Sequence, residues 1–344
     1  MPRYLLATTA LAGTVALGAV AAVPLAAQSP SPDAGASPAR TEWGVPDFTG
    51  VWTTDDMRGV PRERPDEFGT RRFLTDEEFA QRLEQDAETR NTQLNRAGAF
   101  RNDFGTRTFR LTSRIIDPPD GKIPALTPAG EARRAARVTG SFGEGPIHGP
   151  EDLTLYDRCI TRGVVGSMGP AIYGNGVYIV QSPGYMAITY EMVHDTRIIP
   201  IDGRPHIGAT VQQYMGDARG HWDGDTLVVE TANFTDKTAI YGTRHSAALR
   251  LVERFRRLDA ETLEYQATVT DAETYTAPWT VTLMLTSPEG FRTFPYECHE
   301  GNRGMHNILS AERAEDAAIA EDLRQGIVRA RKPVQSVADD DENE

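Results

Sequence analysis

The chain has 344 residues, of which 39% are hydrophobic, and a formal net charge of −13 at pH 7. This composition is typical of a globular protein, and an acidic chain without a lysine and arginine cluster argues against nucleic acid as a partner. The chain has two cysteines and no Cys-x-x-Cys pair, which argues against redox catalysis and a cysteine-based zinc site.

The N-terminus has the pattern of an export signal. Arg3 is the only early charge, an apolar stretch runs from Tyr4 to Val23, and small residues follow at Ala26 and Ala27. This pattern predicts a signal peptide over residues 1–27 and a periplasmic or secreted protein. The alternative is an uncleaved membrane anchor, because the apolar stretch is long enough to span a bilayer. After cleavage we expect no transmembrane segment.

The segment that follows is expected to hold two helices outside the core. Residues 28–40 are rich in Ser, Pro and Ala and predict a disordered linker. Residues 41–150 predict an N-terminal extension packed on the core, with strands at Phe48–Trp52 and Arg107–Ile116. The capping box from Thr75 to Glu78 opens a helix that runs to about Asn95. A second helix begins after Thr127-Pro128 and runs to about Val138.

Residues 151–310 predict an antiparallel β core. Short turns join runs of alternating residues, so neighbouring strands must be antiparallel and form a meander. The fold class is therefore mainly β, either a lipocalin-like β-barrel or a β-sandwich, with peripheral helices. The expected strands are Gly176–Gln181, Tyr185–Val193, Thr196–Ile201, Gln212–Trp222, Asp225–Thr231, Leu249–Leu258, Thr262–Thr270, Trp279–Thr286 and Phe291–Tyr296.

The chain is expected to end in a helix and a tail. Residues 311–332 carry apolar positions at helical spacing and predict a C-terminal helix. Residues 333–344 are acidic and predict a disordered tail.

The strongest turn signal is Asp223-Gly224, which lies between two strand-like runs. A turn at these two residues would pair Trp222 with Asp225 and Arg219 with Val228. Because side chains alternate along a strand, one face would carry the apolar residues Ala218, Trp222, Leu227 and Val229. The other face would carry Asp217, Arg219, His221, Thr226 and Glu230.

Several motifs resemble a family of uncharacterised exported bacterial β-rich proteins. They include Gly220-His-Trp222, Gly224-Asp-Thr-Leu-Val-Val229, Asn233-Phe-Thr-Asp236 and Cys298-His-Glu-Gly-Asn302. The resemblance implies export and a β-rich fold, and it implies no activity, cofactor or catalytic residue. The start Phe48-Thr-Gly-Val-Trp52 also resembles the opening of lipocalin-like barrels.

Cys159 and Cys298 are expected to form a disulfide, because an oxidising compartment favours their pairing. The alternative is a pair of buried free thiols.

The charged face of the hairpin supplies the first catalytic candidates. If this face lines the interior, Arg219 can hold Glu230 ionised, and His221 can carry protons near neutral pH. His194 can replace His221, since it follows the apolar side of a strand that includes Tyr190. The alternatives are that the charged face is the wet side of the sheet and that His194 is a core histidine.

Further site candidates lie in the turns. His299 and Glu300 follow Cys298, and Gly301 permits the turn that would bring both into one site. Arg197 and Arg204 can bind an anionic group by bidentate hydrogen bonds, with Tyr190 and Trp222 as aromatic walls. The alternative for both arginines is an ordinary place on the surface.

No cofactor is expected. A metal held by histidines and a carboxylate stays an alternative, although no helical His-x-x-x-His spacing occurs. The nucleophile motif of serine hydrolases and a dinucleotide fingerprint are both absent.

Together these features predict an exported β protein that binds a small organic molecule. The sharper hypothesis is a cofactor-free acid–base enzyme, namely a hydrolase, lyase or isomerase. The alternatives are a non-catalytic lipocalin-like carrier and an envelope interaction module. The oligomeric state is not predicted.

Overall fold

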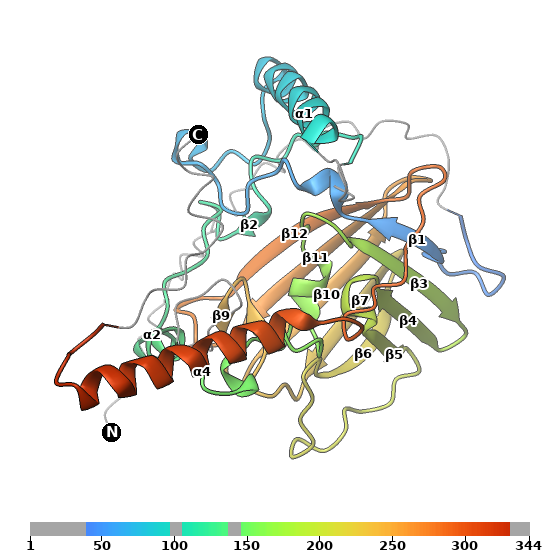
Figure 1. Cartoon of the computed structure of the whole chain (residues 1–344). Coiled ribbons are helices and arrows are strands. Elements are labelled where there is room, and N and C mark those ends of the chain that lie inside the picture. Colours follow the sequence, from blue (N-terminus) through green and yellow to red (C-terminus); the bar gives the residue numbers. More distant parts are fainter. Residues whose placement is uncertain (1–38, 97–104, 137–145, 331–344) are drawn as a thin grey trace, which may run out of the picture. The chain divides into compact units, whose positions relative to one another are not determined.

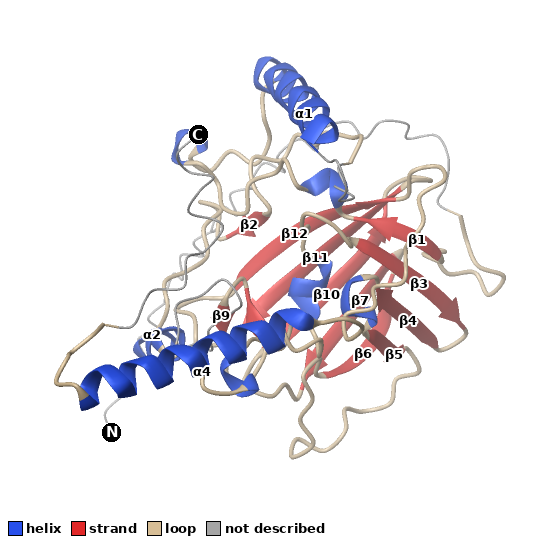
Figure 2. Cartoon of the chain, in the orientation of Figure 1, coloured by secondary structure: helices blue, strands red, loops and turns tan. Residues whose placement is uncertain are grey.

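The structure is a computed structural model that describes residues 39–96, 105–136 and 146–330. The predicted signal peptide, the acidic tail and most of the predicted linker lie outside these residues. The described residues belong to one compact unit. Strands are its main element (red in Figure 2).

One ten-stranded antiparallel sheet forms the body of the described chain. Its order is β5-β4-β3-β1-β12-β11-β10-β7-β6, with β2 paired to β12. Figure 1 shows these strands side by side in a curved layer. Their bounds are β1 Gly50–Thr53, β2 Ile115–Asp117, β3 Gly176–Ser182, β4 Tyr185–Tyr190, β5 Thr196–Pro200, β6 Asp217–Asp223, β7 Thr226–Ala232, β10 Arg250–Arg257, β11 Thr262–Thr270 and β12 Trp279–Thr286.

The remaining elements are short or exposed. A small hairpin pairs β8 (Ala239–Ile240) with β9 (Thr243–Arg244). The helices are α1 Asp76–Arg96, α2 Pro128–Ala135, α3 Val164–Met168 and α4 Arg303–Arg324. Short 3-10 turns lie at η1 Asp55–Met57, η2 Asp66–Phe68, η3 Pro150–Asp152 and η4 Met192–His194. Only Leu309 and Glu312 are buried in α4, which fits the expected peripheral position.

Most sequence-predicted elements occur, and the exceptions have physical reasons. The helix that begins at Thr75 has its capping box, since Glu78 N donates to Thr75 Oγ1 and Thr75 N donates to a Glu78 carboxylate oxygen. Phe291–Tyr296 forms no strand, because no ladder pairs with it. Of the predicted strand Arg107–Ile116, only Ile115 and Ile116 lie in β2. The last helix begins at Arg303 instead of 311, where Asn302 caps it through Met305 N.

The mainly β, antiparallel fold class is confirmed, and the closed barrel is not found. The edge strands β5 and β6 approach each other through side chains. Gly220 on β6 faces Ile199 and Ile201, and a Cβ at this glycine would meet both within 3.4 Å. No hydrogen-bonded ladder joins β5 to β6 in the described sheet. The sheet therefore curls until its edges touch without closing into a continuous barrel.

Alternation along the strands produces the apolar interior. On β11 the side chains of Leu263, Tyr265, Ala267 and Val269 are fully buried. Trp279, Val281, Leu283 and Leu285 of β12 lie beside them on the same face. A period of two places every second side chain on one face of a strand, and here this face is the core.

A buried ion pair crosses this interior. Arg197 on β5 donates two hydrogen bonds to the Glu253 carboxylate on β10, at 2.9 and 2.7 Å. Tyr265 donates to Glu253 at 3.1 Å, and Arg197 also bonds Tyr190 and Thr231. Burial alone lowers the pKa of Arg197, but the carboxylate outweighs it and raises that pKa well above its usual value. This polar core network ties one edge of the sheet to strands across the interior.

The disulfide between Cys159 and Cys298 is present, as the sequence predicted. It closes a loop of 139 residues, for which the chain-entropy model gives at most about 5 kcal/mol of stabilisation. The bridge joins the segment before α3 to the segment before α4.

Glu253→Gln should strongly destabilise the fold. The substitution leaves the Arg197 guanidinium buried without its counter-charge, and breaking such pairs costs about 3–5 kcal/mol. Urea unfolding of wild type and variant measures the loss. The matched control is Arg197→Met with Glu253→Leu, which removes both charges and should recover much of the stability. Equal losses in the single and the double variant would show that the pair does not hold the interior.

Candidate functional site

The β6–β7 hairpin has the predicted faces but another register. Asp223 pairs with Thr226, so the turn consists of Gly224 and Asp225 instead of Asp223 and Gly224. Gly224 has a φ of +58°, which glycine adopts without strain. Each residue consequently pairs two positions further along than expected, and Arg219 lies directly opposite Glu230. A shift by two positions preserves the side-chain faces.

The expectation that the charged face lines the interior is wrong. His221 and Glu230 are exposed, whereas Leu227 and Val229 on the other face are fully buried. Burial of apolar area decides this orientation, because the face with Trp222, Leu227 and Val229 supplies the larger hydrophobic gain. The charged face is thus the outer side of the sheet, exposed at His221 and Glu230 and covered at Asp217. The roles given to His221 and Glu230 gain no support.

Arg219 is engaged by a different partner. It donates to the Asp217 carboxylate at 2.6 Å and to the Pro205 carbonyl at 2.9 Å. The same carboxylate bonds His206 Nδ1 and Ile207 N, both at 2.9 Å. Burial raises the pKa of Asp217, but these hydrogen bonds outweigh it and lower that pKa overall. Arg219 and Asp217 therefore anchor the loop from β5 to β6.

The predicted binding groups separate into two places. Arg197 and Tyr190 meet in the polar core network, where both are buried. Arg204 is exposed, pairs with Asp202 and bonds the Tyr185 hydroxyl at 2.5 Å. Trp222 lines a cavity of about 210 Å³ at the ends of β3 and β6. Its other lining residues include Trp43, Tyr185 and Ile201.

The side chains of His299 and Glu300 are both exposed. The turn expected at Gly301 does occur, with a φ of +65°. His299 and Glu300 therefore lie near the disulfide without forming a joint site.

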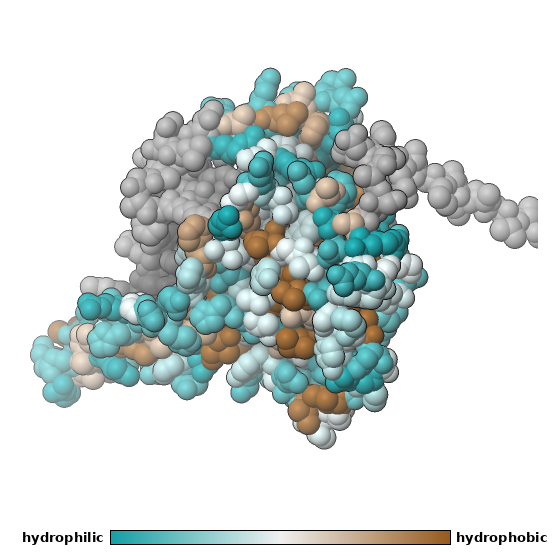
Figure 3. Space-filling model, turned by 90° about the vertical axis from the view of Figure 1, so that its right-hand side faces the viewer, coloured by the Kyte–Doolittle hydropathy of each residue, from teal (hydrophilic) through white to brown (hydrophobic). Residues whose placement is uncertain are grey.

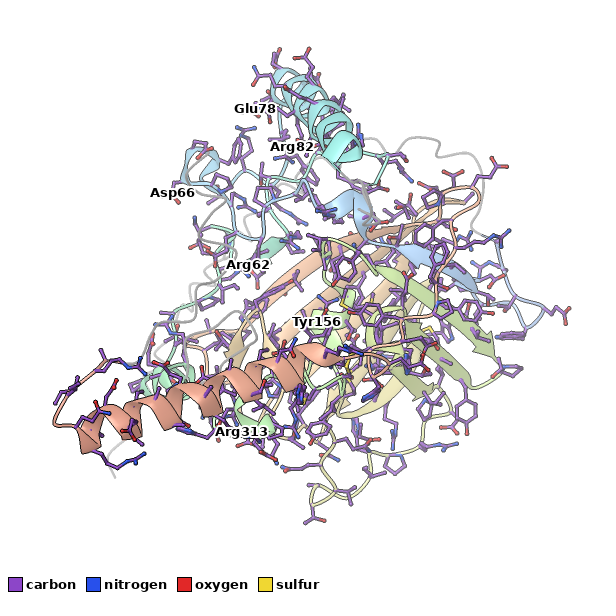
Figure 4. The ribbon with its side chains drawn as sticks, in the orientation of Figure 1. Arg62, Asp66, Glu78, Arg82, Tyr156 and Arg313 are labelled. Atoms are coloured by element: carbon purple, nitrogen blue, oxygen red, sulfur yellow. A yellow bond between two sulfur atoms is a disulfide. The ribbon has the colours of Figure 1, made fainter. Side chains whose placement is uncertain are left out.

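A group of side chains that the sequence did not predict lies next to the disulfide. It consists of Arg162, Tyr156, Tyr173 and Tyr296, and we refer to it as the tyrosine cluster (Tyr156 is labelled in Figure 4). The hydroxyls of Tyr156 and Tyr296 are 3.1 Å apart, and the rings of Tyr173 and Tyr296 stack with centroids 6.3 Å apart. The Arg162 guanidinium lies 5.7 Å from the centroid of the Tyr156 ring.

The electrostatics of this cluster favour neutral tyrosines beside a cation. Burial raises the pKa of Tyr156, and its hydrogen bond to Tyr296 raises it further. Burial also raises the pKa of Tyr296. Burial lowers the pKa of Arg162, while Tyr156, Tyr296 and Tyr173 act in the opposite direction. Within the described residues Arg162 forms no ion pair with a carboxylate. Its charge is therefore desolvated without being balanced.

His194 lies beside this cluster in a strained turn, and like His221 its side chain is exposed. Its Nδ1 is 2.9 Å from the carbonyl oxygen of Tyr296. A carbonyl only accepts, so Nδ1 carries the proton and Nε2 of the neutral imidazole keeps its lone pair. Val193 and His194 have φ values of 68° and 45°, a region that β-branched Val rarely adopts. Strain of this kind costs about 1–3 kcal/mol per residue and is concentrated at functional sites.

Two features hold the cluster together. The buried carboxylate of Glu191 accepts from Gly176 N at 3.0 Å and from Phe294 N at 2.8 Å, which joins β3, η4 and the segment before Tyr296. The disulfide joins the loop of Tyr156 to the segment of Tyr296. Tyr156 lies three residues before Cys159, and Tyr296 lies two before Cys298. Because the disulfide was predicted, the position of each tyrosine close to one of its cysteines could have predicted that Tyr156 and Tyr296 lie together.

No group of three or more His, Cys, Asp or Glu side chains among the described residues is arranged to bind a metal ion. Within the same residues, no helix combines the length and the apolar character needed to cross a bilayer.

The fold and site define an antiparallel β protein with a tyrosine and arginine cluster beside a disulfide. No protein-family model, curated protein or solved structure matches the chain.

Tyrosine ionisation should be delayed in the folded protein. Burial raises the pKa of Tyr156, Tyr190, Tyr241, Tyr265, Tyr275 and Tyr296, that of Tyr190 to about 12. Above a pH of about 10 the unfolded chain loses these protons and the folded chain retains them, so the free energy of unfolding falls as the pH rises. Phenolate absorbance of native and urea-unfolded protein checks this result. Identical titration curves for the two states would contradict it, and Tyr265→Phe should remove one late-titrating group.

Proposed function

We propose that the protein is an exported β protein that binds a small organic anion at the tyrosine cluster. The observation that carries the proposal is the partly buried Arg162 guanidinium, which no described carboxylate balances. A desolvated cation is costly unless a counter-charge or hydrogen bonds compensate it. An anionic ligand group would supply both.

The neutral tyrosines fit the same role. Their hydroxyls can donate to the ligand, and their rings offer stacking surfaces. The rings of Tyr173 and Tyr296 are inclined by 22°, so both present broad apolar faces. A planar organic acid would match such a lining better than an inorganic ion. Export is consistent with the Cys159–Cys298 bridge, since disulfides persist in oxidising compartments.

The reaction that fits best is cofactor-free acid–base chemistry by a hydrolase, lyase or isomerase. His194 replaces His221 as the proposed proton carrier, because its Nδ1 is occupied by Tyr296 O and its Nε2 is left as a base. A hydrogen bond that fixes the tautomer and ring orientation is what a catalytic imidazole requires. Arg162 would stabilise negative charge that develops on the substrate.

A second candidate function is a non-catalytic carrier. The cavity of about 210 Å³ beside Trp222 has aromatic walls, and His221 and Glu230 are not among its lining residues. A carrier needs such an apolar recess with the ionisable groups outside. The third hypothesis, an interaction module, has less support. On the face in Figure 3, apolar residues are interspersed with hydrophilic ones instead of forming one large patch.

Arg162→Gln should abolish retention of an anionic ligand at the tyrosine cluster. Protein exported to the periplasm and examined by native mass spectrometry should carry a small acidic molecule in the wild type. Loss of a charged hydrogen bond weakens binding by about tenfold or more. Arg158→Gln, a half-buried arginine in the same loop, is the matched control and should retain the molecule. Retention of the same molecule by Arg162→Gln, in the wild-type amount, would exclude the cluster as its binding site.

His194→Gln should distinguish the enzyme hypothesis from the carrier hypothesis. If the molecule identified above is turned over, removal of the base should slow turnover by about 100-fold or more. His221→Gln should leave turnover unchanged. If only His221→Gln lost turnover, His221 on the β6–β7 hairpin would be the proton carrier instead of His194. If the wild type released the molecule chemically unchanged, the carrier hypothesis would be favoured.

A further inference from the structure

A second set of polar side chains lies beside β12, apart from the tyrosine cluster. Arg114 N donates to Pro61 O at 2.8 Å, and Ile115 N donates to Arg62 O at 3.0 Å. These bonds place Arg62 and Arg114 on neighbouring segments. Arg114 O accepts from Thr282 N at 2.8 Å, which attaches both segments to β12.

Two aromatic side chains complete this set. The Arg62 guanidinium lies 5.1 Å from the centroid of the Tyr241 ring, and Tyr241 lies 6.1 Å from the ring of Trp279. Burial raises the pKa of Tyr241, while the charges of Arg114 and Arg62 act in the opposite direction. Both guanidiniums thus act on this hydroxyl. We refer to Arg62, Arg114, Tyr241 and Trp279 as the donor cluster.

Three polar atoms of the donor cluster are buried without a hydrogen-bond partner among the described residues. They are Arg114 Nε, the Tyr241 hydroxyl and Trp279 Nε1. Buried polar groups in folded proteins nearly always have partners, so three such atoms in adjacent side chains require an explanation. Leaving a buried donor unpaired costs about 1–3 kcal/mol.

The chemistry of the missing partner follows from these groups. Arg62, Arg114 and Trp279 can only donate, and the Tyr241 hydroxyl can donate as well. Neither arginine forms an ion pair within the described part of the chain. A partner that accepts several hydrogen bonds and carries negative charge would satisfy all of them. A single water would leave the two positive charges unbalanced.

We infer that the donor cluster is a binding site for a small oxyanion, the carboxylate of an organic acid or a phosphate group. It shares no residue with the tyrosine cluster and does not depend on the function proposed for it. Tyr241 has a φ of 48°, a conformation that a non-glycine residue rarely adopts, and its ring lies near Gly169. The Arg62 guanidinium lies over this ring, and the charges of both arginines act on the hydroxyl.

The indole signals of the four tryptophans provide a direct test. Trp279 Nε1 is unpaired, whereas Trp52 Nε1 donates to Phe48 O at 2.8 Å and serves as an internal control. Sodium acetate and inorganic phosphate are titrated separately, at constant ionic strength, into ¹⁵N-labelled protein. The Trp279 signal, assigned with Trp279→Phe, should move saturably, and the Trp52 signal should stay. The probe that binds more tightly distinguishes a carboxylate from a phosphate site.

Variants test each donor. Tyr241→Phe keeps the ring and removes the hydroxyl, and Arg62→Gln removes an exposed charge. Each substitution should raise the apparent Kd of the bound probe, acetate or phosphate, by about tenfold. Arg303→Gln, an exposed arginine at the start of α4, should leave it unchanged.

Three results would overturn the inference. The first is a Trp279 signal that responds to neither probe. The second is an unchanged titration in both Tyr241→Phe and Arg62→Gln. The third is loss of the response in Arg162→Gln, because the two clusters would then form a single site.

Discussion

The ion pair between Arg197 and Glu253 is the constraint that the rest of the structure depends on. It joins β5, at one edge of the sheet, to β10 across the interior. Two charges in an apolar core are costly, and only bidentate geometry with the surrounding hydroxyls offsets that cost. Tyr190 and Arg197 are also the residues on either side of the turn that contains Val193 and His194. The network therefore holds both ends of the strained turn, which explains how its unfavourable φ values persist.

The chain combines an acidic surface with arginines that have no acidic partner. Its net charge is −13, yet Arg162 and Arg114 lie partly buried without a carboxylate among the described residues. An unbalanced charge at such a position costs stability. The two proposed anion sites would account for both arginines. Neutral tyrosines beside both arginines allow close approach of an anion without adding repulsion.

The alternation of apolar and polar residues in the sequence was sufficient to predict most strands of the sheet. It was not sufficient to predict the candidate site. β11 and β12 have their predicted bounds, because β-branched or aromatic residues fill both runs. Burial alternates along most of β11, whereas nearly all of β12 is buried. Residues alternate in Phe291–Tyr296 as well, but this segment has no strand beside it to pair with. A local sequence pattern cannot indicate whether such a neighbour exists. The hairpin at Gly224 had the right faces, but its charged face was assigned to the interior. Arg162 and Tyr296 are distant in the sequence, so only tertiary pairing brings them together.

The bridge between Cys159 and Cys298 has one more consequence. Tyr156 and Tyr296 reach each other from segments that this covalent link joins. Neither cysteine lies in a strand of the sheet, whose ladders are formed by other residues. Without the bridge, the segments of Tyr156 and Tyr296 would lose their covalent link. If the tyrosine cluster is the binding site proposed above, oxidation of the two cysteines is therefore a condition for its assembly.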